Sequence, residues 1–99
     1  MLFSRNELKP LLTRITTNEP DLTSLQLSHK KITNKQLIQI SDALKTNSHI
    51  TEIWLTNNQI TDDRDTAGSV GYFMGVLETN RSVGEVYLGG NKIGTKGGK

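Results

Sequence analysis

The sequence predicts an α/β domain built from short parallel strands that alternate with helices. Two observations lead to this fold class. One aliphatic string occurs three times, in residues 22–32, 50–60 and 83–93. The segments between the strings carry apolar residues at spacings of three and four, which marks one face of a helix. We therefore expect repeated strand and helix units whose apolar faces share one interior.

Each strand is predicted from one copy of the aliphatic string, in which alternate residues point into the interior. The three copies are Leu22-x-x-Leu25-x-Leu27-x-x-Lys30-x-Ile32, Ile50-x-x-Ile53-x-Leu55-x-x-Asn58-x-Ile60 and Val83-x-x-Val86-x-Leu88-x-x-Asn91-x-Ile93. The copies begin 28 residues apart (22 to 50) and then 33 residues apart (50 to 83), so the second unit is longer by five residues. We place this insertion in residues 62–68.

The helices are predicted from three matching apolar triplets, each followed by a Thr-Asn pair. The triplets are Leu8, Leu11 and Ile15; Leu37, Ile40 and Leu44; and Val70, Phe73 and Leu77. The first helix precedes the first strand, and we interpret it as an N-terminal cap. Pro10 has no amide hydrogen and is tolerated in a first turn. This helix is therefore expected to begin near Lys9 or Pro10, although Ser4 and Glu7 could cap an earlier turn.

The ninth position of the string is Asn58 in the second copy and Asn91 in the third, whereas Lys30 replaces Asn in the first. An amide there can satisfy backbone groups at the turn that leaves the strand, because it carries a donor and an acceptor. With these residues, segment 22–97 resembles the leucine-rich repeat family, and the 28-residue spacing resembles its ribonuclease-inhibitor-like class. The resemblance implies a short right-handed leucine-rich repeat solenoid, a horseshoe fragment with parallel concave strands, convex helices and an N-terminal capping helix.

The chain of 99 residues has the length of one domain. We divide it into an N-terminal helical cap (1–20), a first repeat (21–48), a second repeat with the insertion (49–81) and a partial third repeat (82–99). The turn at Lys30 is either held differently or belongs to an atypical terminal repeat. Residues 91–99 read like the start of a further helical segment, so either the chain is truncated or the last strand stays uncovered.

The amino-acid composition excludes several classes of partner and site. Apolar residues make up 33% and aromatic residues 5%, which suits an elongated body better than a compact globule. The net charge is +2 with mixed signs, so we expect no nucleic-acid partner. The absence of Cys excludes disulfides and thiolate metal sites; it suits a reducing compartment and also permits an oxidising one. The first residues lack the apolar stretch of a signal peptide or membrane span, so we expect a cytoplasmic protein with no membrane partner.

Residues for catalysis are scarce. His29 and His49 are far apart in sequence, and we interpret both as ordinary surface residues. The acidic segment 62–65 lacks the glycine and distal glutamate of a calcium loop, and the glycines at 89–90 and 94–98 read as turns and a frayed end. We therefore predict no catalytic residue, no cofactor, no metal and no small-molecule substrate.

The outward positions of the strands are the most informative. The repeat aligns Ser24, Glu52 and Glu85 in one column, Gln26, Trp54 and Tyr87 in the next, and Ser28, Thr56 and Gly89 in a third. Neighbouring strands lie about 4.8 Å apart, so the Trp and Tyr rings are expected to touch. They could serve only as a stabilising cross-strand pair, or as a binding hot spot flanked by carboxylates. The candidate partner-binding residues are Gln26, His29, Glu52, Trp54, Asn57, Glu85 and Tyr87.

The resemblance implies a non-catalytic protein-protein interaction module that binds a partner through its concave strands. That family includes inhibitors that cover the active site of an enzyme, so an enzyme with a basic surface is one expected partner. It also includes small effectors of intracellular bacteria, which are translocated into a host cell. The alternative is an assembly fragment of a longer horseshoe that stacks through its C-terminal edge. An enzyme is the third hypothesis, and the groups for it are missing.

Overall fold

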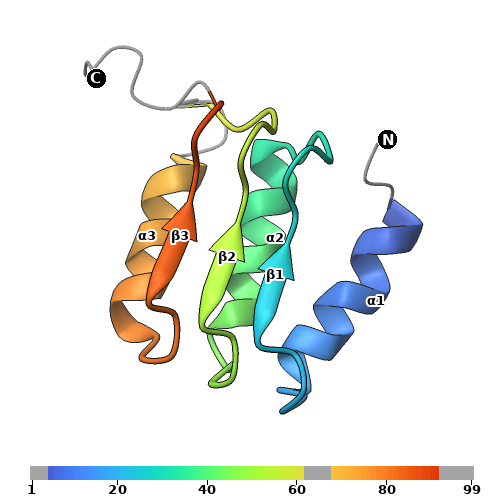
Figure 1. Cartoon of the computed structure of the whole chain (residues 1–99), viewed down its shortest axis with the longest axis vertical. Coiled ribbons are helices and arrows are strands. Elements are labelled where there is room, and N and C mark those ends of the chain that lie inside the picture. Colours follow the sequence, from blue (N-terminus) through green and yellow to red (C-terminus); the bar gives the residue numbers. More distant parts are fainter. Residues whose placement is uncertain (1–4, 62–67, 92–99) are drawn as a thin grey trace.

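Helices and strands alternate along the chain in the computed structural model, which describes residues 5–61 and 68–91 (Figure 1). The elements are α1 (Arg5–Thr16), β1 (Ser24–Gln26), α2 (Asn34–Leu44), β2 (Glu52–Trp54), α3 (Ser69–Thr79) and β3 (Glu85–Tyr87). Each strand lies in one copy of the aliphatic string, and each apolar triplet lies in one helix. The predicted alternation of strand and helix is confirmed.

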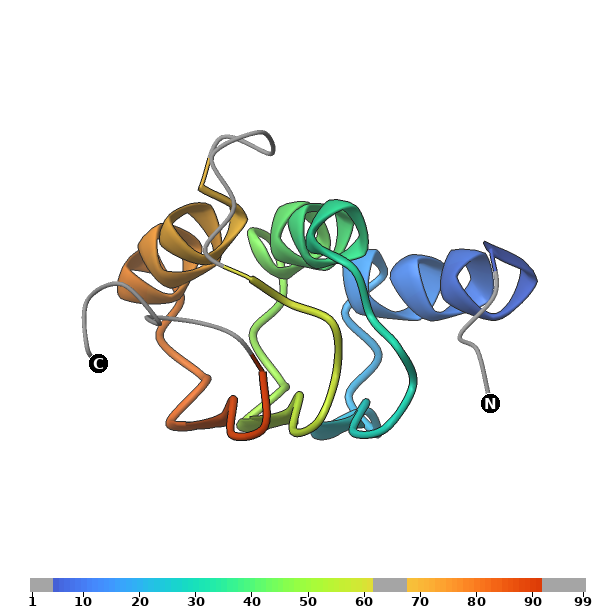
Figure 2. The same cartoon turned by 90° about the horizontal axis from the view of Figure 1, so that it is seen from above.

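The strands form one parallel sheet in the order β1-β2-β3. Its register pairs Ser24 with Glu52 and Glu52 with Glu85, and it pairs Gln26 with Trp54 and Trp54 with Tyr87. These are the first two predicted columns. The three described helices lie in one layer on the same side of the sheet, and no described helix or strand covers the other side (Figure 2).

The core lies between the sheet and the helix layer. Its side chains come from the aliphatic strings and from the predicted helix faces; those with no exposed surface include Ile15, Ile32, Leu37, Ile40, Leu44, Ile50, Ile53, Leu55, Ile60 and Phe73. The third unit is less covered, because Val83, Val86 and Leu88 are only half-buried. The core is therefore complete around β1 and β2 and open at β3.

Helix α1 begins earlier than predicted. It already includes Arg5, so Pro10 lies inside the helix instead of in its first turn. Pro10 is exposed, where its ring does not disturb the core. The predicted cap residue Ser4 lies outside the described residues, as do residues 62–67 of the insertion predicted at 62–68 and the C-terminal segment 92–99.

The predicted overall shape was wrong. The Cα radius of gyration is 12.7 Å, and the extents are 38 × 29 × 21 Å. A compact domain of 100 residues has a radius of about 13 Å, so the chain is not an elongated body. The curvature of a horseshoe accumulates from small rotations over many stacked units. Residues 5–61 and 68–91 form a small α/β domain with three parallel strands and three helices, so the predicted leucine-rich repeat solenoid was wrong.

In the described part of the chain, no helix has both the length and the apolar character that a membrane crossing requires.

Candidate functional site

An aromatic pair lies on the uncovered side of the sheet. Trp54 from β2 and Tyr87 from β3 stack with ring centroids 3.9 Å apart and planes inclined by 18°. Trp54 is half-buried, and Tyr87 is 36% exposed. Both rings point away from the core, because the aliphatic residues on either side of each ring in the strand face the helices: Ile53 and Leu55 are buried, and Val86 and Leu88 are half-buried. The predicted contact between the rings is confirmed.

A polar network fixes Trp54 and its neighbours. The Trp54 indole N–H donates to Oε1 of Glu52 (3.0 Å), and the Ser24 hydroxyl donates to the same oxygen (3.1 Å). The Gln26 amide donates in turn to the Ser24 hydroxyl (3.0 Å). The indole N–H, followed by the Ser24 hydroxyl, lowers the pKa of Glu52 below its usual value because both bonds favour the carboxylate. The carboxylate of Glu52 therefore stays charged and well oriented.

A second carboxylate adjoins the first. Glu85 is the register partner of Glu52 on the next strand, so two like charges lie directly opposite each other. Desolvation of the hydroxyl, followed by the negative charge of Glu85, raises the pKa of Tyr87 above its usual value. The two glutamates and the two rings form one continuous feature, which we call the aromatic-acidic surface (Glu52, Trp54, Glu85 and Tyr87).

The turns that follow the strands adopt one shared backbone conformation. His29, Asn57 and Gly90 occupy equivalent positions and have φ values of 61°, 57° and 75°, in the left-handed region. Nδ2 of Asn57 lies 3.3 Å from Nε2 of His29. The structure thus brings these two candidate residues together at the ends of β1 and β2, where both side chains are exposed.

Asparagine side chains join each strand turn to the preceding unit. Oδ1 of Asn58 accepts from the backbone N–H groups of Lys30 and Ile32, and its Nδ2 donates to the carbonyls of Leu27 and Leu55. Asn91 repeats this pattern one unit later. The predicted role of these amides is confirmed. Lys30 occupies this position in the first unit, and in the described residues the element before β1 is the helix α1, so no described strand turn precedes Lys30 for an amide to join.

A second series of amides was not predicted. The Asn residue of each Thr-Asn pair links the end of one helix to the next unit. Asn47 Nδ2 donates to the Ile15 carbonyl, and Asn80 Nδ2 donates to the carbonyls of Leu44 and Asn47. Oδ1 of Asn18 lies 2.9 Å from Nδ1 of His49, so this half-buried histidine is part of the same series. The repetition of the Thr-Asn pair was the signal that could have found it.

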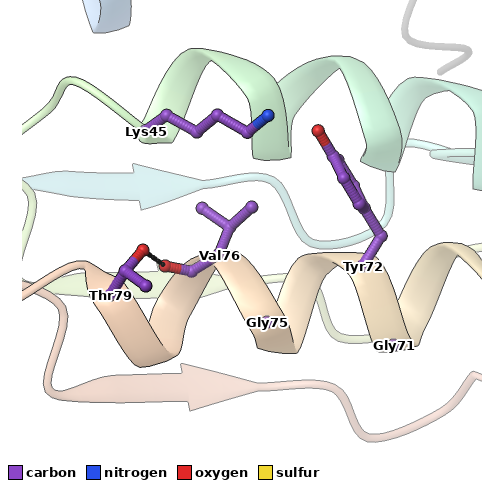
Figure 3. Close-up of a pocket in the computed structure, with 6 residues that line it drawn as sticks. All are labelled: Lys45, Gly71, Tyr72, Gly75, Val76 and Thr79. Atoms are coloured by element: carbon purple, nitrogen blue, oxygen red, sulfur yellow. Dashed lines mark hydrogen bonds between the residues drawn. The ribbon is translucent and has the colours of Figure 1, made fainter.

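A groove lies on the helix side, between α2 and α3. It has a volume of about 570 Å³ and is lined by Lys45, Gly71, Tyr72, Gly75, Val76 and Thr79 (Figure 3). The Lys45 ammonium and the Tyr72 hydroxyl point toward one another across it. Both groups contact Asp42, which accepts a hydrogen bond from Tyr72 and pairs with Lys45 at 3.3 Å. These polar groups satisfy one another, and the Thr79 hydroxyl, also in the groove wall, donates to the Val76 carbonyl.

Among residues 5–61 and 68–91, no three His, Asp or Glu side chains are grouped closely enough to hold a metal ion. The acidic segment 62–65 lies outside these residues. The strand side of the sheet combines partly exposed aromatic rings with two carboxylates, the kind of side chains found in binding hot spots.

No protein-family profile and no curated protein match this sequence. Solved structures do match. The chain is similar to a Caenorhabditis elegans tropomodulin C-terminal domain, with 18% identity and a TM-score of 0.71 over 88% of this chain and 50% of that one. It is also similar to leiomodin-1 actin-binding site 2, with 16% identity and a TM-score of 0.60 over 91% of this chain and 64% of that one. At these identities the likeness shows the fold alone.

These comparisons correct the predicted identity. The matching structures are described as tropomodulin and leiomodin domains, so the assignment to the ribonuclease-inhibitor-like class of leucine-rich repeat proteins was wrong, and so was the extension to bacterial effectors. The aliphatic string accepts several residue types at each position. Its spacing alone therefore could not distinguish the ribonuclease-inhibitor-like class from other proteins in which strands and helices alternate. The chain spans half the length of the tropomodulin domain and 64% of the leiomodin one.

Proposed function

We propose that the chain is a non-catalytic protein-binding domain whose contact surface is the uncovered side of its sheet. The single observation that supports this function most strongly is the stacked and partly exposed Trp54–Tyr87 pair. Trp and Tyr are enriched in binding hot spots because they bury much apolar area with few rotatable bonds. Gln26, His29 and Asn57 would contribute contacts at the margin of this surface.

The comparisons agree with a protein partner and suggest a first one to test. One of the two similar structures is described as an actin-binding site. Actin is therefore the first defined candidate for this chain, in monomeric and filamentous form. The comparisons give no support to an enzyme as the partner, and we do not carry the predicted inhibition of an enzyme forward. A cytoplasmic location stays a prediction from the sequence.

The test removes the aromatic pair. Trp54→Ala combined with Tyr87→Ala should weaken partner binding by at least about 2 kcal/mol, the usual hot-spot threshold. The same variant should lose no more than about 1 kcal/mol of folding free energy, because the pair lies outside the core. Cosedimentation with actin and affinity capture from cells, each compared with the parent chain, measure the binding; thermal unfolding measures the stability.

The control is Met74→Ala, which removes another exposed apolar side chain (45% exposed) from the helix side. It should bind like the parent. If the double variant and the parent retain the same partners with equal affinity, the strand side is not the contact surface. If the double variant unfolds, the rings belong to the core.

A second candidate function is assembly through the edge of the sheet at β3. The observation in its favour is that Val86 and Leu88 are half-buried, whereas their counterparts Ile53 and Leu55 have no exposed surface. Sedimentation velocity over a hundredfold concentration range would test it. A monomer throughout would exclude this candidate, and a concentration-dependent shift that Val86→Lys abolishes would support it.

A further inference from the structure

We propose that the aromatic-acidic surface recognises an arginine side chain that projects from a basic segment of the partner protein. This inference rests on the proposed function and specifies the chemistry of the partner. The guanidinium would lie against the exposed ring of Tyr87 and donate to the carboxylates of Glu52 and Glu85. No described side chain of the domain itself takes that place.

The two surface glutamates, Glu52 and Glu85, are the first reason to expect a cationic ligand. In residues 5–61 and 68–91, the ion pairs join Arg14 to Glu19 and Lys45 to Asp42, and neither involves the two surface glutamates. Glu52 and Glu85 face each other across neighbouring strands. Like charges directly opposite in a sheet are destabilising. A cation supplied by a partner would relieve this repulsion and give the surface a charge complementarity that the ion pairs of residues 5–61 and 68–91 do not supply.

The aromatic rings decide which cation fits best. Guanidinium is planar, donates from five N–H groups and stacks on aromatic faces, whereas ammonium is a compact and strongly hydrated charge. The Trp54–Tyr87 stack offers a flat ring face beside two carboxylates. The indole N–H and the Ser24 hydroxyl both hold Glu52, so its carboxylate is already oriented before binding. An arginine meets all these groups at once, and a lysine does not.

A defined peptide tests the proposal without knowledge of the partner. The probe is acetyl-Gly-Arg-Gly-Arg-Gly-amide, with a lysine version and a citrulline version as controls; citrulline keeps the shape of arginine and lacks its charge. Trp54 is the only Trp in the chain, so fluorescence and the indole N–H resonance report on this surface alone. Titrations at low salt should give a saturable change with the arginine peptide, a weaker one with lysine and none with citrulline.

Substitution separates the charges from the rings. Glu52→Gln combined with Glu85→Gln should weaken binding of the arginine peptide by about fivefold or more, because it removes two exposed ion pairs to the guanidinium and leaves the ring contact in place. Glu85→Gln alone should melt no lower than the parent, because it removes the repulsion between the two glutamates. A structural role for Glu85 would instead lower the melting temperature. Glu78→Gln on α3, another exposed glutamate, should leave peptide binding unchanged.

The outcomes distinguish this inference from the proposed function. Equal responses to the arginine and citrulline peptides, or no response to either, would overturn the arginine proposal. So would a captured partner that binds the double Gln variant as tightly as the parent. In those cases the protein-binding function stands as long as Trp54→Ala with Tyr87→Ala still abolishes capture of the partner. Unchanged capture by that aromatic variant would overturn the function itself.

Discussion

At the scale of single residues, the turns after the strands restrict most strongly which residue type can occupy a position. Gly90 has a φ of +75°, and a Cβ there would lie 1.8 Å from Oδ1 and 2.7 Å from Cγ of Asn57. The Asn57 side chain would have to rotate away from His29, and the left-handed backbone would still be strained. Gly90→Ala should therefore cost about 1–3 kcal/mol of folding free energy.

Gly89→Ala is the matched control for this prediction. A Cβ at Gly89 meets no atom within 4 Å, and the residue does not have a positive φ. Chemical denaturation of both variants should show a loss for Gly90→Ala and a change within about 0.5 kcal/mol for Gly89→Ala. Equal stability of the two would mean that this turn does not hold the left-handed conformation.

The pKa of Glu52 tests the polar network at the same scale. Trp54→Phe keeps an aromatic ring and removes the indole N–H, the largest cause of the lowered pKa. The pKa of Glu52 should then move up toward its ordinary value, as followed by carboxyl chemical shifts during a pH titration. A lowered folded pKa contributes stability above the unfolded pKa, and this contribution is lost as the pH falls through the folded pKa. Tyr87→Phe should leave the indole bond intact and move the Glu52 pKa less.

At the scale of elements, the periodicity of the sequence predicted the strands, the helix faces and the two strand columns. Ile53 and Leu55 are buried in and just after β2, and Leu37 and Ile40 are buried in α2, as their spacing required. The string also placed the Asn58 amide correctly. The string itself did not reveal the amides that follow the helices, because these residues lie outside it and their partners belong to the neighbouring unit. The start of α1 was placed too late because Pro10 was assigned to a first turn.

Helix α3 offers a clear prediction at the scale of elements, since two neighbouring residues differ strongly in exposure. Phe73 has no exposed surface, whereas Met74 is 45% exposed. Phe73→Ala should cost about 3–5 kcal/mol, because it removes a large ring from a small core. Met74→Ala should change the stability by less than about 0.5 kcal/mol. Similar melting temperatures for the two variants would show that the helix face had been assigned incorrectly.

At the scale of the whole molecule, the sequence was a weaker guide. Three copies of a strand and helix unit do not determine which larger architecture they belong to, and low apolar content suggested an elongated body that the radius of gyration excludes. The candidate site was predicted better than the architecture, because its side chains repeat within the string: Trp54 and Tyr87 stack, and Glu52 and Glu85 pair, as their columns required. The groove between α2 and α3 was not predicted, since it arises where helices from different units meet.

The two sides of the molecule should act independently, and the helix groove provides the test. Gly75 lines the groove on α3 and is exposed, and a Cβ added at this position would meet no atom within 4 Å. Gly75→Arg therefore adds its Cβ without a clash and introduces a charged side chain at the groove. This substitution should stabilise the folded domain, raising its free energy of unfolding by about 0.5–1 kcal/mol, because Arg has a higher helix propensity than Gly.

The same variant should bind the partner and the arginine peptide like the parent, because the helices lie on the opposite side of the sheet from the aromatic-acidic surface (Figure 2). Gln26→Arg, on the strand side in the column of Trp54 and Tyr87, should weaken both interactions, since it places a competing cation beside Glu52. Loss of binding in Gly75→Arg with normal stability would move the contact surface to the groove. Loss in Gln26→Arg alone places it on the strands, where the carboxylates and rings lie together.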